Sequence, residues 1–242
     1  MLSNIQIIDL ALYFDSVLVI ADVHIGYEEA LNKQGVLVPR LQFQEIIKKM
    51  EKILGALKDE KIKKIIVNGD LLHEFGTISE QEWRNTLKFI DLLARHCSEI
   101  ILIKGNHDKI LGHIADKRNI NVLGHYAVKN ILVCHGDKIP EKKVLESAST
   151  IIIGHEHPAV SIKDGARIEN FKCFLKGKYK GRNLIVQPSF NPIIEGTNVL
   201  RDKALSPFLK QSLDDFEVYV VEDKVYEFEK LKNLRENFST LS

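Results

Sequence analysis

Short apolar runs separated by longer amphipathic stretches are the main pattern of the first half of the chain. Five of these runs are rich in β-branched residues and too short for helices, which predicts buried strands. They cover residues 17–20, 65–67, 100–103, 131–133 and 151–153. Because strands that alternate with helices usually pair in parallel, the first three are expected to form a parallel sheet.

Two stretches between these strands show the 3.6-residue apolar period of amphipathic helices. The first is predicted to span about residues 39–58. The second is predicted to begin near Ser79, because Ser79 and Glu82 have the spacing of a capping box. Its buried face is expected to hold Trp83, Leu87, Ile90 and Ala94.

The helical pattern fades after about residue 119. Strand-like segments follow at residues 127–134, 167–175, 184–186 and 217–228, and residues 193–212 are predicted to form a long loop. A chain of 242 residues is within the size of one α/β domain. We therefore predict an α/β fold, α+β in the C-terminal half, in a single domain covering residues 1–242.

Composition narrows the class of protein. Hydrophobic residues make up 45 % and charged residues 28 %, which argues against disorder. The net charge of +1 excludes a generally basic surface but leaves room for a local basic patch. Three widely spaced cysteines without a CxxC pair indicate reduced thiols. No apolar run approaches the length of a membrane helix and no secretory signal begins the chain, so a cytoplasmic location is expected.

Polar side chains follow each of the five predicted strands directly. The strand ends carry, in order, Asp22 and His24; Asp70 and His73; Asn106, His107 and Asp108; His135; and His155 and His157. Six of the nine histidines fall in these motifs. Because sites in parallel sheets form beyond the carboxyl ends of the strands, these side chains are expected to gather at one place.

The chemistry of this set favours divalent metal ions. It offers carboxylates, imidazoles and one amide oxygen without a thiolate, which suits Mn, Fe, Co, Ni or Zn. One tetrahedral ion would not use so many donors. Two ions about 3.5–4 Å apart, bridged by one carboxylate, would use them all and could hydrolyse a phosphate ester.

Each residue also has a purely structural interpretation. Asp22 and Asp70 could cap helices, and Asn106 could support a turn. His24 could be a core histidine, and His107 could have a structural role. His73 is expected to lie beside the metal ligands rather than among them.

The five motifs together resemble the calcineurin-like metallophosphoesterases. They read Asp-x-His, Gly-Asp-x-x-His, Gly-Asn-His-Asp, His-Gly and Gly-His-x-His in that order. Residues 22–39, 69–76 and 188–192 are further similar to archaeal and bacterial phosphoesterases related to double-strand-break repair nucleases, some of which are associated with DNA ligase and helicase genes. The resemblance implies two facing mixed β-sheets flanked by helices in a four-layer sandwich.

The resemblance also implies a role for each site residue. Asp22, His24 and His157 would hold one metal ion, Asn106, His135 and His155 the other, and Asp70 would bridge them. His107 would protonate the leaving oxygen, and Asp108 would orient His107. Manganese is the preferred metal, with Ni, Co, Fe or Zn as alternatives. The implied activity is a phosphodiesterase that attacks phosphorus with a metal-bridging hydroxide.

A basic segment bears on the substrate. Residues 163–182 contain seven basic and two acidic residues. Within this segment Lys176, Lys178, Lys180 and Arg182 alternate, so they would share one face of a strand or hairpin. Such a face could contact a nucleic-acid backbone, although edge strands also carry lysines to prevent association between sheets.

Three functions remain open at this point. The first is a phosphodiesterase of unknown substrate, and the second is a nuclease acting on single-stranded or nicked DNA, with repair partners such as a ligase or helicase. The third is a catalytically inactive interaction scaffold, which is disfavoured because every expected ligand position is filled.

Overall fold

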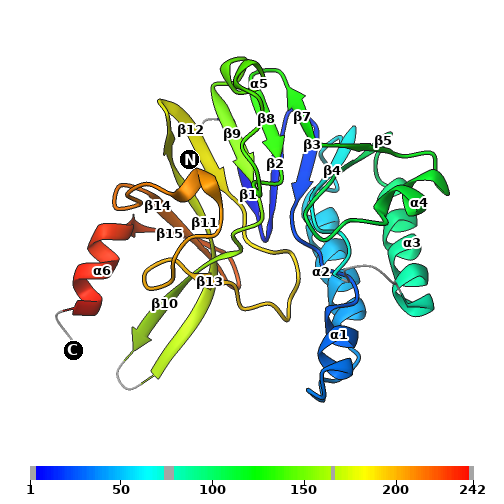
Figure 1. The fold of residues 1–242 in the computed structure, drawn as a ribbon, viewed down its shortest axis with the longest axis horizontal. Helices are drawn as coiled ribbons and strands as arrows, with labels where there is room; N and C mark the ends of the chain where they lie inside the picture. Colours follow the sequence, from blue (N-terminus) through cyan, green and yellow to red (C-terminus); the bar gives the residue numbers. More distant parts are fainter. Residues whose placement is uncertain (1–3, 74–78, 165–166, 240–242) are drawn as a thin grey trace. The chain divides into compact units, whose positions relative to one another are not determined.

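The computed structural model of the chain describes residues 4–73, 79–164 and 167–239 (Figure 1). The chain divides into two compact units, one made of Met1–Gly124 with Phe190–Ile194 and the other of His125–Ser189 with Glu195–Ser242. Each unit contains one β-sheet. That the two units form a single domain stays a prediction.

The first unit contains a six-stranded mixed sheet. Its strands are β1 (Gln6–Ile8), β2 (Ala11–Phe14), β3 (Val17–Ile20), β4 (Lys64–Asn68), β5 (Glu99–Ile103) and β6 (Asn121–Leu123), in that spatial order. The strands β3 to β6 are parallel, whereas β1 and β2 pair antiparallel. The predicted parallel pairing of the first three apolar runs is confirmed, and their carboxyl ends therefore lie at one edge of this sheet.

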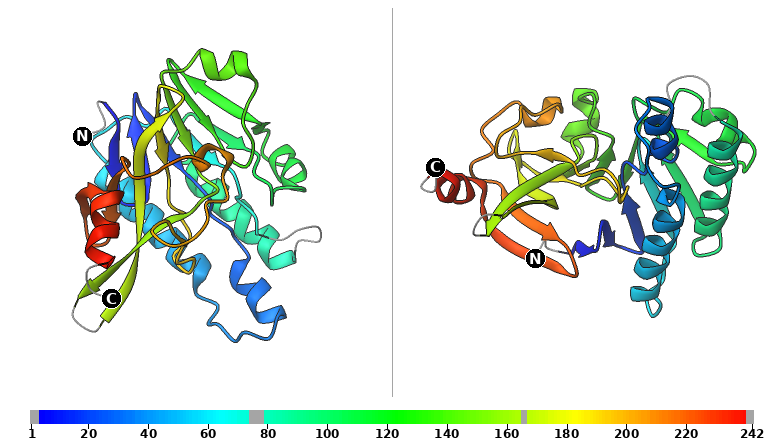
Figure 2. Two further views of the ribbon diagram at one scale, coloured as in Figure 1. Left: turned by 60° about the vertical axis from the view of Figure 1, so that its left-hand side comes forward. Right: turned by 90° about the horizontal axis from the view of Figure 1, so that it is seen from below.

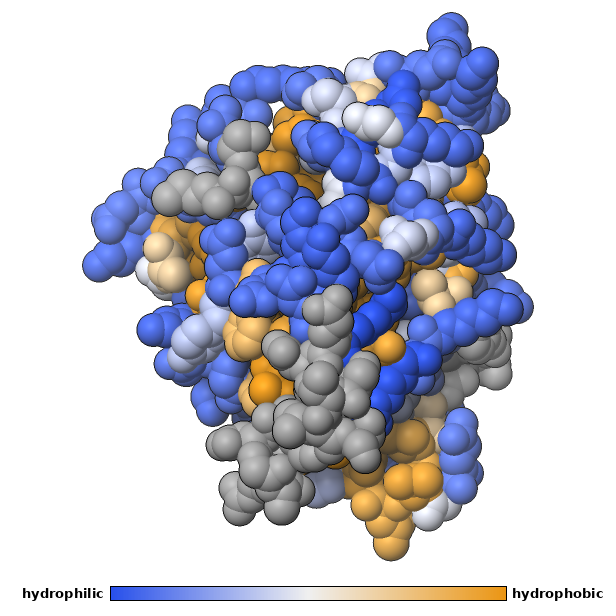
Figure 3. Space-filling model, turned by 90° about the vertical axis from the view of Figure 1, so that its left-hand side faces the viewer, coloured by the Kyte–Doolittle hydropathy of each residue, from blue (hydrophilic) through white to orange (hydrophobic). Residues whose placement is uncertain are grey.

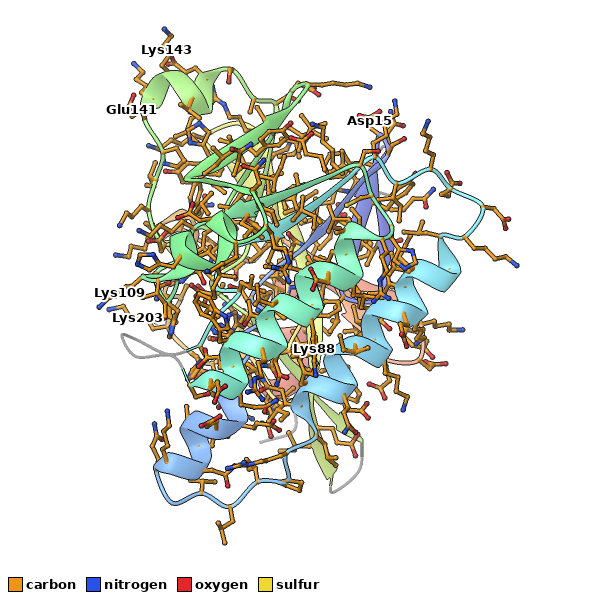
Figure 4. The ribbon with its side chains drawn as sticks, turned by 90° about the vertical axis from the view of Figure 1, so that its right-hand side faces the viewer. Asp15, Lys88, Lys109, Glu141, Lys143 and Lys203 are labelled. Atoms are coloured by element: carbon orange, nitrogen blue, oxygen red, sulfur yellow. The ribbon has the colours of Figure 1, made fainter. Side chains whose placement is uncertain are left out.

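Two long helices connect the parallel strands of the first unit. They are α2 (Gln42–Ala56) and α3 (Glu80–Ala94), which lie side by side with Lys88 of α3 on their outer surface (Figure 4). The helix α2 begins later than predicted, at the point where the Glu28 carboxylate accepts a hydrogen bond from Gln42 N (2.8 Å). The predicted cap of α3 is confirmed, since Ser79 Oγ accepts from Glu82 N (3.0 Å).

The buried face of α3 differs from the prediction. The helix buries Thr86, Phe89, Ile90 and Leu93, whereas Trp83 and Leu87 are partly exposed and Ala94 is exposed. The Phe89 ring lies 6.5 Å from that of Phe190, which returns to this unit from a distant part of the sequence. The buried Phe89, Ile90 and Leu93 also follow the helical period, so the helix is confirmed and the predicted face was wrong. Two short helices, α1 (Tyr27–Lys33) and α4 (Leu111–Asp116), complete the unit.

The second unit contains a nine-stranded mixed sheet. Its strands are β7 (His125–Val128), β8 (Ile131–Cys134), β9 (Thr150–Ile153), β10 (Pro158–Asp164), β11 (Arg167–Tyr179), β12 (Arg182–Val186), β13 (Thr197–Asn198), β14 (Glu217–Val221) and β15 (Val225–Lys230). The buried strands β8, β9 and β12 are parallel. The long strands β10 and β11 form an antiparallel ribbon (Figure 2).

Two predicted strands are hairpins in the structure. The segment 127–134 turns at residues 129–130, where Lys129 has a positive φ of 54°, and the segment 217–228 turns between β14 and β15. The predicted loop 193–212 is largely irregular but contains β13 and a 3₁₀ turn, η1 (Pro207–Leu209). The helices α5 (Lys142–Glu146) and α6 (Leu231–Ser239) were not predicted.

The fold class is confirmed as two mixed sheets flanked by helices. The core of the second unit contains Cys134. Across the described ranges, none of the helices is both long and apolar enough to cross a membrane.

Candidate metal centre

In the first unit, the loops after β3 and β4 carry three buried polar donors. Asp22, His24 and Asp70 are 0 %, 2 % and 2 % exposed, respectively. The loops continue the parallel pairing of their strands, because His24 N donates to Asp70 O (2.9 Å) and Asp22 N donates to Gly69 O (3.2 Å). These backbone bonds hold the three donors at one edge of the first sheet.

Asp70 lies at the middle of this group. Its Oδ1 accepts a hydrogen bond from His107 N (2.9 Å), and its Oδ2 lies 3.9 Å from His24 Nε2. The backbone of Gly105 approaches so closely that a Cβ there would lie 2.7 Å from Asp70 Cγ, and nearer still to its Oδ1 and backbone nitrogen. The loop after β5 can therefore reach Asp70 only with glycine at this position.

Three imidazoles of the first unit lie within reach of one cation. A ring nitrogen of each of His24, His73 and His107 lies within 4.8 Å of the others. The closest pair is His24 Nδ1 and His73 Nδ1, 3.4 Å apart. The His73 ring is stacked with the His107 ring and meets the Tyr27 ring edge-on, with centroid distances of 5.4 and 4.7 Å. His73 thus lies directly among the predicted site residues.

His107 has a defined ring orientation. Its Nδ1 lies 2.8 Å from the backbone carbonyl oxygen of His73. Because a carbonyl oxygen can only accept, this contact assigns the hydrogen to Nδ1. The other ring nitrogen, Nε2, is then the one available for proton transfer.

The Asp108 side chain links two loops of the first unit by hydrogen bonds. Its carboxylate is buried, with Oδ1 accepting from Leu72 N (3.1 Å) and Oδ2 accepting from Gly105 N (3.0 Å). These bonds tie the loop after β4 to the loop after β5. Asn106 is exposed and lies between Gly105 and His107.

The second unit brings its own donors together. His135 follows β8 and is 1 % exposed, and its ring lies 4.9 Å from that of His155, which follows the neighbouring strand β9. Gly154 N donates to His135 O (2.8 Å), which extends the parallel pairing past the strand ends. The carbonyl oxygen of His157 accepts from Thr197 N (2.8 Å).

Five of the predicted metal ligands share an unusual backbone conformation. Asp22, His24, Asp70, His155 and His157 have φ values between 46° and 67°, in the left-handed region. They are five of the twelve non-glycine residues with positive φ in the part of the chain that is described. Each costs about 1–2 kcal/mol relative to ordinary backbone, and such strain concentrates at functional sites.

Comparison with known families identifies the chain. The profile described as calcineurin-like phosphoesterase matches residues 16–215. The chain belongs to this family. A search of curated protein sequences finds no significant match.

One solved structure shows the same fold as this chain, and two further structures match it at lower TM-scores. The nuclease MPE of Pseudomonas putida is 18 % identical, with a TM-score of 0.63 over 92 % of this chain and 94 % of its own. A Vps29 double mutant from Entamoeba histolytica is 15 % identical, with a TM-score of 0.37 over 88 % of this chain and 99 % of its own. The phosphoesterase YfcE of E. coli is 11 % identical, with a TM-score of 0.36 over 86 % and 88 %.

Two polar residues that the sequence analysis missed hold the His24 backbone in the phosphoesterase. Gln42 Nε2 donates to His24 O (2.9 Å), and Asn191 Nδ2 donates to the same oxygen (3.2 Å) and to Val23 O (3.1 Å). Gln42 and Asn191 are 2 % and 0 % exposed. Asn191 falls in the segment 188–192 that supported the resemblance, whereas no sequence signal marks Gln42.

Glu156 is a third missed residue, between His155 and His157. Its side chain is fully buried, and its Oε2 accepts a hydrogen bond from Ser206 N (2.8 Å). Ser206 Oγ in turn donates to Gly136 O (2.7 Å), beside His135. This network connects both histidine-bearing loops of the second unit. Burial raises the pKa of the Glu156 carboxyl above its ordinary value.

The basic segment of the phosphoesterase has its own contacts in the second unit. Lys176 Nζ pairs with Glu217 (2.8 Å), and Arg182 Nε donates to two backbone carbonyl oxygens of residues 145 and 148 (2.8 and 3.1 Å). Lys178 and Lys180 are exposed, with Lys178 donating to Asn183 Oδ1 (2.7 Å) and Lys180 lying over the Tyr179 ring. Across the turn Arg182 pairs with Tyr179, so it lies on the opposite face to Lys176 and Lys178. The prediction that the four basic residues share one face is therefore wrong.

Proposed function

We propose that this member of the family is a metal-dependent phosphodiesterase with two divalent ions. The observation that carries the proposal is the gathering of Asp22, His24 and Asp70 at one sheet edge, buried and on strained backbones. Buried charges are normally paired or bound to metal ions. Two buried carboxylates beside imidazoles form a donor set that suits borderline divalent cations.

The proposed assignment of ligands draws on both units and follows the family resemblance. One ion would be held by Asp22, His24 and His157, the other by Asn106, His135 and His155, with Asp70 shared. Supporting it, each unit by itself brings its own donors to the ends of neighbouring parallel strands. Manganese is the preferred metal because of the family resemblance and because hard carboxylate and amide oxygens are among the donors. When bound, the ions would supply positive charge for the phosphoryl oxygens and acidify a water molecule.

His107 is proposed as the proton donor to the leaving oxygen. Because the His73 carbonyl holds the hydrogen on Nδ1, His107 must be doubly protonated to donate from Nε2. Stacking against the His73 ring further restricts the His107 ring. Asp108 is proposed to orient His107 indirectly. Its carboxylate accepts hydrogen bonds from Leu72 N and Gly105 N, which fixes the backbone that carries the His107 ring.

The test is hydrolysis of bis(p-nitrophenyl) phosphate after chelation, with and without added Mn²⁺. Asp70→Asn keeps an oxygen for the His107 N–H but loses the charge, so activity should fall to background while the fold persists. Asp116→Asn, on an exposed position of α4, should leave the rate unchanged. Hydrolysis that needs no divalent ion, or full activity of Asp70→Asn, would contradict the proposal, and bound metal without hydrolysis would favour the inactive scaffold.

The role of His107 has a separate test based on the leaving group. His107→Ala should lower the rate by about 10²–10⁴-fold for an alkyl leaving group, which needs protonation. The loss should be much smaller for p-nitrophenolate, which leaves without a proton. Equal losses for both leaving groups would exclude general acid catalysis by His107.

The second candidate function is hydrolysis of DNA, single-stranded or nicked. It is favoured by the fold relative that is named as a nuclease and by the outward-facing Lys178 and Lys180. Partners in repair, such as a ligase or helicase, belong to this proposal. Binding to DNA that weakens steeply with salt would support it.

A further inference from the structure

The loop of residues 34–41 in the first unit exposes an unusual amount of apolar surface. Leu37 is 90 % exposed, Leu41 54 % and Val36 49 %. They are three of the seven large apolar residues that are exposed in the described parts of the chain. Figure 3 shows hydrophobic side chains exposed at the lower end of the view, at the same height as the loop after α1 in Figure 1.

The loop is structured by specific bonds. Gly35, with φ of 87°, ends α1 in a Schellman motif, in which Val36 N donates to Leu31 O and Gly35 N to Asn32 O, both at 3.0 Å. Asn32 Nδ2 also donates to Val38 O (3.2 Å). The apolar side chains are therefore presented outward by a held backbone, which lowers the entropy lost on binding a partner.

The segment formed by α1 and the loop is attached at both ends to residues of the predicted site. At its start, the Tyr27 ring contacts the His73 ring. At its end, Gln42 exchanges hydrogen bonds with Glu28, through Gln42 N to Glu28 Oε2 (2.8 Å) and Glu28 N to Gln42 Oε1 (3.3 Å). Gln42 also donates to the carbonyl oxygen of His24. The loop is thus fixed beside the donors of the first unit.

The charge of the loop indicates the class of ligand that it binds. Residues 33–41 carry Lys33 and Arg40 and no acidic residue. An apolar tip with basic flanks complements a strand of nucleic acid, whose bases are apolar on their faces and whose phosphates are anionic. A helix of seven residues at 1.5 Å per residue sets the loop about 10 Å from Tyr27. Only a substrate that extends beyond the phosphodiester being cleaved would therefore reach the loop.

We propose that the 34–41 loop is a nucleic-acid contact in which Leu37 packs against unpaired bases that flank the phosphodiester being cleaved. This inference rests on the proposed function and makes the substrate class more specific. It assigns Leu37 to substrate specificity and not to the chemical step.

The test compares oligodeoxynucleotides of two to eight residues with bis(p-nitrophenyl) phosphate. For the wild type, kcat/KM should be higher for the longer oligonucleotides than for dinucleotides. Leu37→Ser should lower kcat/KM for the longer oligonucleotides about tenfold, the scale of partly burying a leucine. Its activity on dinucleotides and on the small diester should not change. Leu205→Ser, at a 62 % exposed leucine of the second unit, is the matched control and should behave as the wild type.

Three results would overturn the inference. Hydrolysis of the small diester with no dependence on oligonucleotide length would reject the loop contact while the proposed function stands. An equal loss on all substrates for Leu37→Ser would show a merely structural role. Finally, if no substrate is cut, binding of a fluorescent 12-mer is measured by anisotropy. Unchanged affinity of Leu37→Ser, or weakened binding only to vesicles of anionic lipid, would reject nucleic acid as the ligand.

Discussion

A methyl group added at Gly105 tests the close approach on which the donor group of the first unit depends. In Gly105→Ala the new Cβ would lie 2.7 Å from Asp70 Cγ and nearer still to the Asp70 backbone nitrogen. A side-chain rotation of Asp70 cannot relieve a contact with its own backbone. The loop carrying His107 must therefore move away from Asp70.

The cost can be estimated from two terms. Overpacking of a tight contact costs about 1–3 kcal/mol. Losing the bond from His107 N to the Asp70 carboxylate, now 2.9 Å long, costs about 1.5–3 kcal/mol. A total of about 2.5–6 kcal/mol lowers the melting temperature by about 5–24 °C for a protein of this size.

The assay is thermal unfolding followed by circular dichroism, with Mn²⁺ content measured on the same samples. Gly112→Ala is the matched control, because a Cβ at Gly112 in α4 would meet no atom within 4 Å. That substitution should raise stability by about 0.5–1 kcal/mol, as expected for glycine to alanine within a helix. If Gly105→Ala melts with the wild type and binds the same amount of Mn²⁺, the proposed approach of Gly105 to Asp70 is wrong.

Two further predictions concern buried groups. Asn191→Ala removes the donor to the carbonyl oxygens of residues 23–24, so unfolding should become easier by about 2–3 kcal/mol in urea titrations; an unchanged midpoint would contradict this. Burial raises the pKa of Cys134 to about 12 and of Cys173 still further, so Ellman's reagent at pH 8 should reach at most Cys97 before denaturation and all three thiols after it. Because the native thiol of Cys134 holds its proton more tightly than the unfolded one, stability should decline as pH rises from about 9 toward 12.

Elements with a local signal were predicted well. Residues 17–20 form β3 as predicted. A run of four apolar residues rich in β-branched side chains is too short for a helix and is typical of a buried strand. The start of α3 was predictable because its cap involves residues three apart in the sequence. The gathering of Asp22, His24 and Asp70 was predictable because each follows a strand closely, and parallel strands end at one edge.

Features that depend on distant residues left no local pattern. Phe89 of α3 lies near Phe190, about a hundred positions further along the chain. The support of His24 by Asn191 joins residues 167 positions apart, and that of Glu156 by Ser206 joins residues 50 apart. Likewise, nothing in the motif around His107 indicates that the His73 carbonyl fixes its tautomer.

The central claim is that donors from several strand ends hold two divalent ions. The most direct measurement is anomalous diffraction at the manganese absorption edge from crystals grown with Mn²⁺. The account predicts two peaks about 3.5–4 Å apart with Asp70 ligating both. A single peak, or two ions of which neither contacts Asp70, would contradict it.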